Sequence, residues 1–151
     1  KNDAIDSDFS SLSIIKSDFT NIGNDAVDGS GSEIQINDCD FNYVFDKAIS
    51  AGEQSDFKIF NVKISNSEIG IVSKDKSDVN INNSSFENNK LDFASFVKKG
   101  FFGASKAKFN SSLPSTYLIE NGSTIIGLEK VIYSNKVEKK LYGNMYGRAS
   151  K

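Results

Sequence analysis

Short runs of alternating apolar and polar residues recur at a constant spacing over the first 90 residues of the chain. One apolar column falls at Ile5, Val27, Ile49 and Ile71, each 22 residues after the last. Alternation predicts strands, and self-similarity at such a period predicts a repeat architecture. Three more columns keep this register, with one extra residue in the third repeat: Leu12, Ile34, Phe57 and Val79; Ile14, Ile36, Ile59 and Ile81; Phe19, Phe41, Ile64 and Phe86.

Polar residues repeat in the same register, between the apolar runs. Asn and Asp tolerate the left-handed backbone of sharp turns and bond to nearby backbone groups. We therefore expect a turn at each of these columns, and three short strands per repeat. The columns are Ser10, Ser32, Ser55 and Ser77; Asp38, Asn61 and Asn83; and Asn21, Asn66 and Asn88.

These patterns predict an all-β fold, a right-handed parallel β-helix of five to six rungs with about 22 residues per rung. Three short strands cannot bury an apolar face alone, but a second rung stacked about 4.8 Å away pairs each strand with its copy. A sandwich of antiparallel strands would have no reason to keep one register in four columns. The right-handed coil follows from the strong preference for right-handed crossovers between parallel strands.

The pattern weakens after Lys90. A fifth rung begins at residues 91–93, the surplus residues 96–106 leave the coil as a loop, and residues 117–126 form a sixth rung. Residues 134–141 have the pattern of a short amphipathic helix, which we expect to cap the stack. The predicted organisation is a β-helix over residues 1–132 and a cap and tail over residues 133–151. Because the chain opens in mid-pattern, we expect it to be a segment of a longer protein, truncated at its N-terminus.

Composition excludes several classes of site. The chain has no histidine and one cysteine, Cys39, so histidine-based catalysis and a cysteine zinc site are excluded. A net charge of −2 does not fit a nucleic-acid binder, which needs a basic surface. No apolar run is long enough for a membrane span.

Stacked aspartates are the first candidate site. Asp3 and Asp6 precede Asp25 and Asp28 by 22 residues, so the predicted register places Asp3 over Asp25 and Asp6 over Asp28. Carboxylate oxygens at this spacing repel one another unless a cation neutralises them, and four of them suit Ca²⁺. The alternative is that they shape turns in solvent, with Lys47 as a counter-charge in the next rung.

The predicted loop is the second candidate. Aromatic rings, two lysines and flexible glycines there fit an acidic glycan or a protein partner, and the alternative is that the rings pack the loop against the coil. The candidate ligand-binding residues are Phe96, Lys98, Lys99, Phe101 and Phe102.

The segments NDAVDGSGSEIQINDCDF, DKAISAGEQSDFKIFNVKI and IGIVSKDKSDVNINNSSF resemble the β-helix repeats of bacterial proteins that carry a spore-coat CotH kinase-like domain. FVKKGFFG and the ending YLIENGS to EKKLYG resemble that group's last rung and tail. The wider likeness is to the pectin-lyase-like superfamily, which includes polysaccharide lyases and glycoside hydrolases. The resemblance implies the β-helix fold and a secreted or cell-surface location. In the lyase-like families, Ca²⁺-binding aspartates assist a basic residue, and Lys47 takes that part here if burial lowers its pKa.

We therefore expect a non-catalytic module of a larger extracellular or surface protein, binding a polysaccharide or a protein partner and requiring no cofactor. Two alternatives remain open. One is a Ca²⁺-assisted polysaccharide lyase or related carbohydrate-active enzyme that uses Asp3, Asp6, Asp25, Asp28 and Lys47, and the other is a purely structural stalk.

Overall fold

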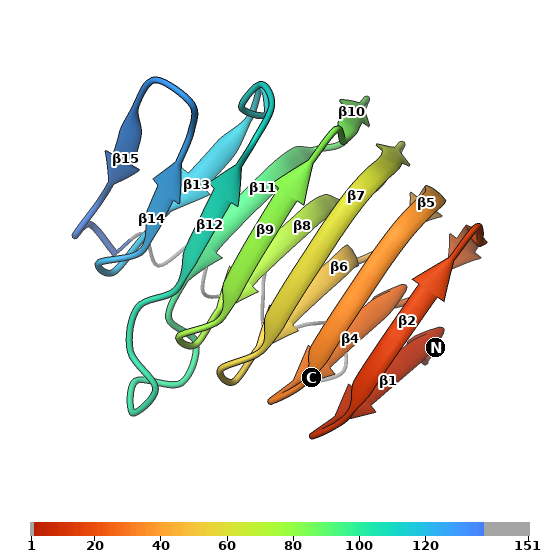
Figure 1. The fold of residues 1–151 in the computed structure, drawn as a ribbon, viewed down its shortest axis with the longest axis horizontal. Coiled ribbons are helices and arrows are strands. Elements are labelled where there is room, and N and C mark those ends of the chain that lie inside the picture. Colours follow the sequence, from red (N-terminus) through yellow and green to blue (C-terminus); the bar gives the residue numbers. More distant parts are fainter. Residues whose placement is uncertain (1, 138–151) are drawn as a thin grey trace.

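The computed structural model describes residues 2–137, which form a two-sheet β-solenoid of about six turns. Figure 1 shows the sheets as two layers whose strands run side by side along one axis. The six-stranded sheet consists of β1 (Ile5–Asp8), β4 (Val27–Ser30), β6 (Lys47–Gly52), β8 (Ile69–Lys74), β11 (Leu91–Phe96) and β13 (Tyr117–Ile119), in that order.

The nine-stranded sheet forms the other layer. Its main path is β2 (Ser11–Ile15), β5 (Glu33–Val44), β7 (Asp56–Ser65), β9 (Asp78–Asn82), β12 (Lys106–Phe109), β14 (Thr124–Ile126) and β15 (Val131–Tyr133). β3 (Asp18–Ile22) pairs with β5, and β10 (Ser85–Glu87) pairs with β7.

Strand register confirms the predicted columns. Ile5 pairs with Val27, Val27 with Ile49, and Ile49 with Ile71, all in parallel ladders. The column extends to Phe93 in the fifth turn and Tyr117 in the sixth. The right-handed sense of the coil stays a prediction.

Stacked polar side chains hold a bend that lies within β5 and β7 and directly after β9. Asp38, Asn61 and Asn83 all adopt positive φ, between 49° and 55°. Asn61 Nδ2 donates to Asp38 Oδ1 at 2.6 Å, and Asn83 Nδ2 donates to Asn61 Oδ1 at 3.1 Å. Each side chain therefore satisfies its neighbour one turn away while it permits the left-handed backbone.

A ladder of serines runs along the corner directly before β5, β7 and β9. Ser32 N–H donates to Ser55 Oγ at 3.0 Å, and Ser55 N–H donates to Ser77 Oγ at 3.1 Å. All three serines are buried. These hydroxyls satisfy backbone groups that the turn leaves out of the ladders, which are costly to bury unpaired.

The apolar columns fill the space between the sheets with like residues stacked on like. Phe19 and Phe41, one turn apart, stack with ring centroids 4.7 Å apart and nearly parallel planes. Phe41, Phe57 and Ile36 are fully buried. This packing explains why the sequence columns are apolar without interruption.

The C-terminal end differs from the prediction. β15 runs antiparallel to β14, and residues 134–137 are not helical. Their backbone bonds to the turn before β14 instead: Asn121 N–H donates to Lys136 O, and Gly122 N–H donates to Ser134 O. The predicted capping helix is therefore wrong for residues 134–137, and its remaining residues lie outside the described part. Within residues 2–137, no helix has the length and apolar character needed to cross a membrane.

Candidate functional site

A buried ion cluster lies at the third turn of the six-stranded sheet. It consists of Asp25, Asp46 and Lys47, and it shares a column with Ile69 of the next turn. Lys47 Nζ lies 3.0 Å from Asp25 Oδ1 and 2.9 Å from Asp46 Oδ2. Lys47 N–H also donates to Asp25 Oδ1 at 3.0 Å. One ammonium is thus held between two carboxylates, out of solvent.

The surroundings decide the protonation of Lys47. Burial lowers its pKa, but the carboxylates of Asp25 and Asp46 outweigh burial, and the net effect raises the pKa above the ordinary value of a lysine. Lys47 is therefore protonated at neutral pH and cannot accept a proton. The condition under which Lys47 could serve as a base, a pKa lowered by burial, is not met.

Burial shifts the pKa of the acidic Asp25 upward, whereas it shifts the pKa of a lysine downward. Burial is the largest effect and raises the pKa of Asp25 to about 6, with the Lys47 ammonium opposing that rise. Asp25 Oδ1 contacts both the ammonium and the backbone N–H of Lys47, and its predicted role as a calcium ligand stays a prediction.

Three of the four predicted metal ligands do come together. Carboxylate oxygens of Asp3, Asp6 and Asp28 lie within 4.8 Å of one another. Asp6 pairs with Asp28 in the β1–β4 ladder, as the 22-residue spacing predicts. Partial burial, and then the nearby carboxylates of Asp8, Asp28 and Asp3, raise the pKa of Asp6.

Parts of this acidic group already have partners. Asp3 Oδ1 accepts hydrogen bonds from Asn24 Nδ2 at 2.6 Å and from Asp25 N–H at 3.0 Å. Lys74 Nζ lies 3.5 Å from Asp28 Oδ1 and donates to Ser50 Oγ at 2.7 Å. The donor set fits a hard cation such as Ca²⁺ in chemistry, but turn formation explains it equally well. Calcium binding here stays a prediction, now resting on three aspartates.

The predicted ligand-binding loop splits into an anchored part and an exposed part. Phe96 ends β11 and is buried, whereas Phe101 is 82% exposed and its ring contacts Phe102. Lys98 is half-buried, and burial together with the charges of Lys74 and Lys47 lowers its pKa. Lys99 forms an ion pair with Glu53. The five predicted residues therefore do not form one surface.

Asp75 anchors the start of this loop. Its Oδ1 accepts hydrogen bonds from Lys98 N–H at 2.7 Å and Lys99 N–H at 2.6 Å. Asp75 is fully buried at a corner with φ of 56°. Sequence reasoning missed Asp75, Glu53 and Asp46. The side chains of Asp75 and Glu53 contact the loop of a later turn, which lies far along the sequence. The direct adjacency of Asp46 and Lys47 was the one available signal.

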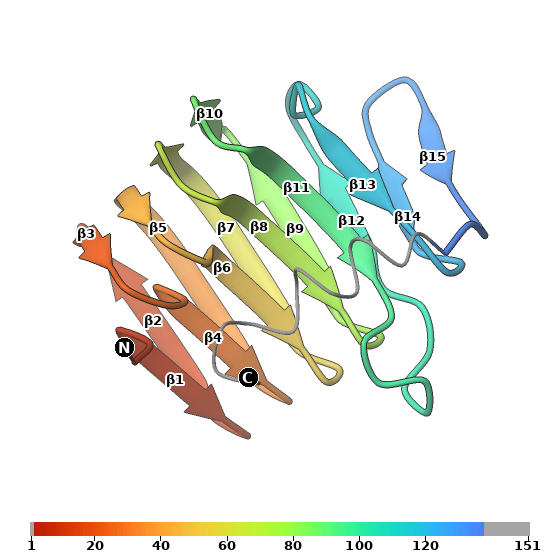
Figure 2. The same cartoon turned by 180° about the vertical axis from the view of Figure 1, so that it is seen from behind.

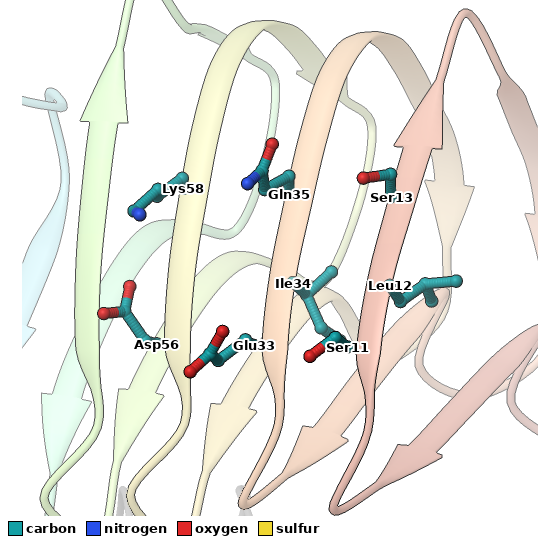
Figure 3. Close-up of a pocket in the computed structure, with 8 residues that line it drawn as sticks. All are labelled: Ser11, Leu12, Ser13, Glu33, Ile34, Gln35, Asp56 and Lys58. Atoms are coloured by element: carbon teal, nitrogen blue, oxygen red, sulfur yellow. The ribbon is translucent and has the colours of Figure 1, made fainter.

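The outer face of the nine-stranded sheet carries a polar ladder that crosses five turns. In Figure 3 the side chains of Ser13, Gln35 and Lys58 form one row across three strands, and those of Ser11, Glu33 and Asp56 form a second. These rows line a shallow hollow of about 250 Å³. Strand register continues both rows through β9 and β12. The polar ladder consists of Ser11, Glu33, Asp56, Asp78 and Lys106, and of Ser13, Gln35, Lys58, Asn80 and Lys108.

Comparison of the chain with protein-family models finds no match, and comparisons with curated proteins and with solved structures also find none. The resemblance to the pectin-lyase-like superfamily and to CotH-associated repeats therefore stays a prediction. Its coarser content, a parallel β-solenoid, is what the structure shows.

Proposed function

We propose that this chain is a non-catalytic binding module whose polar ladder takes an extended polysaccharide. The observation that carries the proposal is the ladder itself: hydroxyl, amide and charged groups repeat once per turn on an exposed face (Figure 3). The spacing between turns is about 4.8 Å. A polymer with repeating hydroxyl groups can bond to such an array at several turns at once, so weak contacts add along its length.

The charges of the ladder favour a sugar over a polyanion. Three acidic residues, Glu33, Asp56 and Asp78, are balanced by Lys58, Lys106 and Lys108. A balanced face gives no net attraction for phosphate backbones, and neutral hydroxyls can use both donors and acceptors. Phe60, 46% exposed on the same face of β7, offers an aromatic surface beside the ladder. The proposal includes a secreted or cell-surface location, where such polymers occur.

The lyase alternative lacks a supporting observation. It needs Lys47 as a proton acceptor, and the raised pKa of Lys47 removes that role. A purely structural stalk stays open, and the following experiment separates it from a binding module.

The test is a polysaccharide array that contains neutral glucans and galactans together with polygalacturonate, probed with the full chain. We expect at least one polymer to bind, and the double variant Gln35→Ala/Lys58→Ala to weaken that binding at least tenfold. The matched control is Lys63→Ala/Glu87→Ala, which removes an exposed ion pair from β7 and β10 outside the ladder and should leave binding unchanged.

Three results would overturn the proposal. If no polymer binds a folded protein, the chain is a stalk. If the ladder variant binds as tightly as the control, the ligand uses another surface. Release of unsaturated uronic-acid products from polygalacturonate would show catalysis and favour the lyase.

A further inference from the structure

The nine-stranded sheet ends in a strand edge that no other strand among residues 2–137 covers. Its last strand is β15 (Val131–Tyr133), and Figures 1 and 2 both show β15 at the outer end of the stack. The six-stranded sheet ends at β13 and has no counterpart of β15, so β15 projects alone beyond the sixth turn. An unpaired edge of this kind is a template on which another strand can pair.

Hydrogen bonds fix which backbone groups of β15 point to this open edge. The carbonyls of Lys130 and Ser134 accept hydrogen bonds from glycine N–H groups on either side of β14, so both point inward. Backbone groups of successive strand residues point to alternate sides. Those of Ile132 therefore also point to β14, whereas those of Val131 and Tyr133 point to the open edge.

The side chains around this edge are apolar and exposed. Val131 is 65% exposed and Tyr133 is 57% exposed, whereas Ile132 between them packs against the core. Leu128 and Val137, on either side of β15, are exposed as well. Edge strands that stay unpaired usually carry lysine or proline, which prevents pairing. The apolar residues of β15 instead indicate a surface that another molecule covers.

A second copy of the chain fits this edge by symmetry. A two-fold axis brings β15 against β15 of the second copy in antiparallel orientation, the orientation in which β15 already pairs with β14. A register centred on Ile132 places Val131 opposite Tyr133 of the second copy, and this contact occurs twice. The outward backbone groups of both residues then exchange hydrogen bonds across the axis.

Charge favours this register over the neighbouring ones. With the pair centred on Ile132, Lys130 lies opposite Ser134 of the second copy, whose hydroxyl can accept a hydrogen bond. The next register that keeps outward groups opposite each other brings Lys130 against Lys136, and like charges directly opposite destabilise a strand pair. The equivalent shift in the other direction sets Lys130 against the apolar Ile132.

We propose that β15 is a dimerisation strand, at which two copies of the chain join their nine-stranded sheets in an antiparallel pair centred on Ile132. Val131 and Tyr133 supply the backbone hydrogen bonds and the apolar contacts across the two-fold axis. The two sheets become one, and the polar ladders of both copies lie on the same face of it. The dimer does not depend on what the ladder binds.

Sedimentation equilibrium of the full chain over a range of concentrations tests the proposal. We expect a dimer at about 100 µM that dissociates on dilution. The variant Val131→Lys/Tyr133→Lys sets lysines opposite each other at both contacts and should weaken association by about tenfold or more. The matched control is Tyr43→Lys/Phe45→Lys, which places the same charge at two other half-exposed aromatic positions and should leave association unchanged. Circular dichroism checks that each variant is folded.

Opposite charges test whether the contact is made by β15 itself. Val131→Glu/Tyr133→Glu should be monomeric alone, as the lysine variant should be. Mixed together, the two variants should form a heterodimer, because each lysine then lies opposite a glutamate. Contact through another surface would give no such recovery.

Amide hydrogen exchange, resolved by residue with NMR, gives a second measurement that needs no variant. In the monomer the N–H groups of Val131 and Tyr133 face solvent and should exchange rapidly. In the dimer they should be protected, and dilution should remove that protection. The N–H of Ile132 points to β14, so it is the internal control and should stay protected in both states.

Four results would contradict the proposal. The first is a folded wild type that stays monomeric at about 1 mM. The second is a dimer in which the N–H groups of Val131 and Tyr133 still exchange rapidly, which would assign the contact to another surface. The third is a mixture of folded, oppositely charged variants that forms no heterodimer. The fourth is an assembly that keeps growing with concentration, which would indicate copies stacked head to tail.

Discussion

At the scale of single residues, each turn contains sharp bends whose backbone polar groups need hydrogen-bond partners. Asn and Asp at the corners adopt positive φ and bond to the equivalent residue of the adjacent turn. Buried serines accept the backbone N–H groups that the bend exposes. The ion cluster is the exception in its charge, because Asp25 Oδ1 accepts the Lys47 backbone N–H and also contacts the Lys47 ammonium out of solvent.

This exception gives a prediction about pH. The pKa of Asp25 is about 6 in the folded state, above its ordinary 3.8, so the folded protein binds the proton more tightly than the unfolded chain. The resulting stabilisation is fully present below pH 3.8 and is lost as pH rises through 6. We expect the free energy of unfolding to fall by about 1 to 3 kcal/mol between pH 4 and pH 7.

Urea unfolding at a series of pH values measures this. Asp25→Asn should flatten the profile, because Asn keeps an oxygen for Lys47 N–H without the charge. Asp18→Asn, at an exposed position, is the control and should keep the wild-type profile. A wild-type stability that rises between pH 4 and pH 7 would contradict the prediction.

At the scale of elements, the loop between β11 and β12 is attached to the coil through the carboxylate of Asp75 and through the ion pair of Lys99 with Glu53. Asp75 accepts two backbone N–H groups of the loop, while its Oδ2 is buried without a hydrogen-bond partner among the described residues. One carboxylate thus sets where the loop departs, and the exposed Phe101 lies beyond that anchor.

We expect Asp75→Gly to release the loop. Glycine keeps the positive φ at this corner and removes only the carboxylate. Limited trypsin digestion should then cut after Lys98 and Lys99 at least tenfold faster than in the wild type. Asp75→Asn retains the acceptor oxygen and should stay close to wild type. Equal cleavage of the Gly and Asn variants would show that the loop is held elsewhere.

The elements differ in how far the sequence could predict them. β1 to β12 follow from columns such as Ile5 to Phe93, because parallel stacking makes each position repeat its neighbour. β15 has no copy in the preceding turns, so its antiparallel pairing left no periodic signal in the sequence. The residues that follow it were therefore predicted as a helix over 134–141. The Asp6–Asp28 pairing and the contact of Asp25 with Lys47 follow from the 22-residue register, whereas the second ion pair of Lys47, with Asp46, joins neighbours within one turn and is not predicted by a repeat.

At the scale of the whole molecule, the first four turns are near copies of one another, so the fold should tolerate loss of one of them. Deleting residues 50–71 joins Ile49 to Val72 and removes 22 residues, which leaves every column in register. Ile36 then meets Ile81, and Phe41 meets Phe86.

We expect the deletion variant to fold into a solenoid about 4.8 Å shorter, with lower stability but the same β-sheet circular dichroism per residue. Small-angle scattering measures the length. Deleting half a turn, residues 50–60, removes the end of β6 and the first half of β7, shifts the later columns out of register and should prevent folding. If both deletions unfold alike, the turns are not interchangeable units.

The constant register also bears on how the chain reaches this state. Successive turns pair residues about 22 positions apart, and this separation stays almost the same from β1 to β11. The entropy lost in closing each loop is therefore nearly equal at every step, however long the coil has grown. Once two adjacent turns have formed, each further turn adds to an existing strand edge. We therefore expect formation of the first pair of turns to limit the rate of folding, and the remaining turns to add one after another.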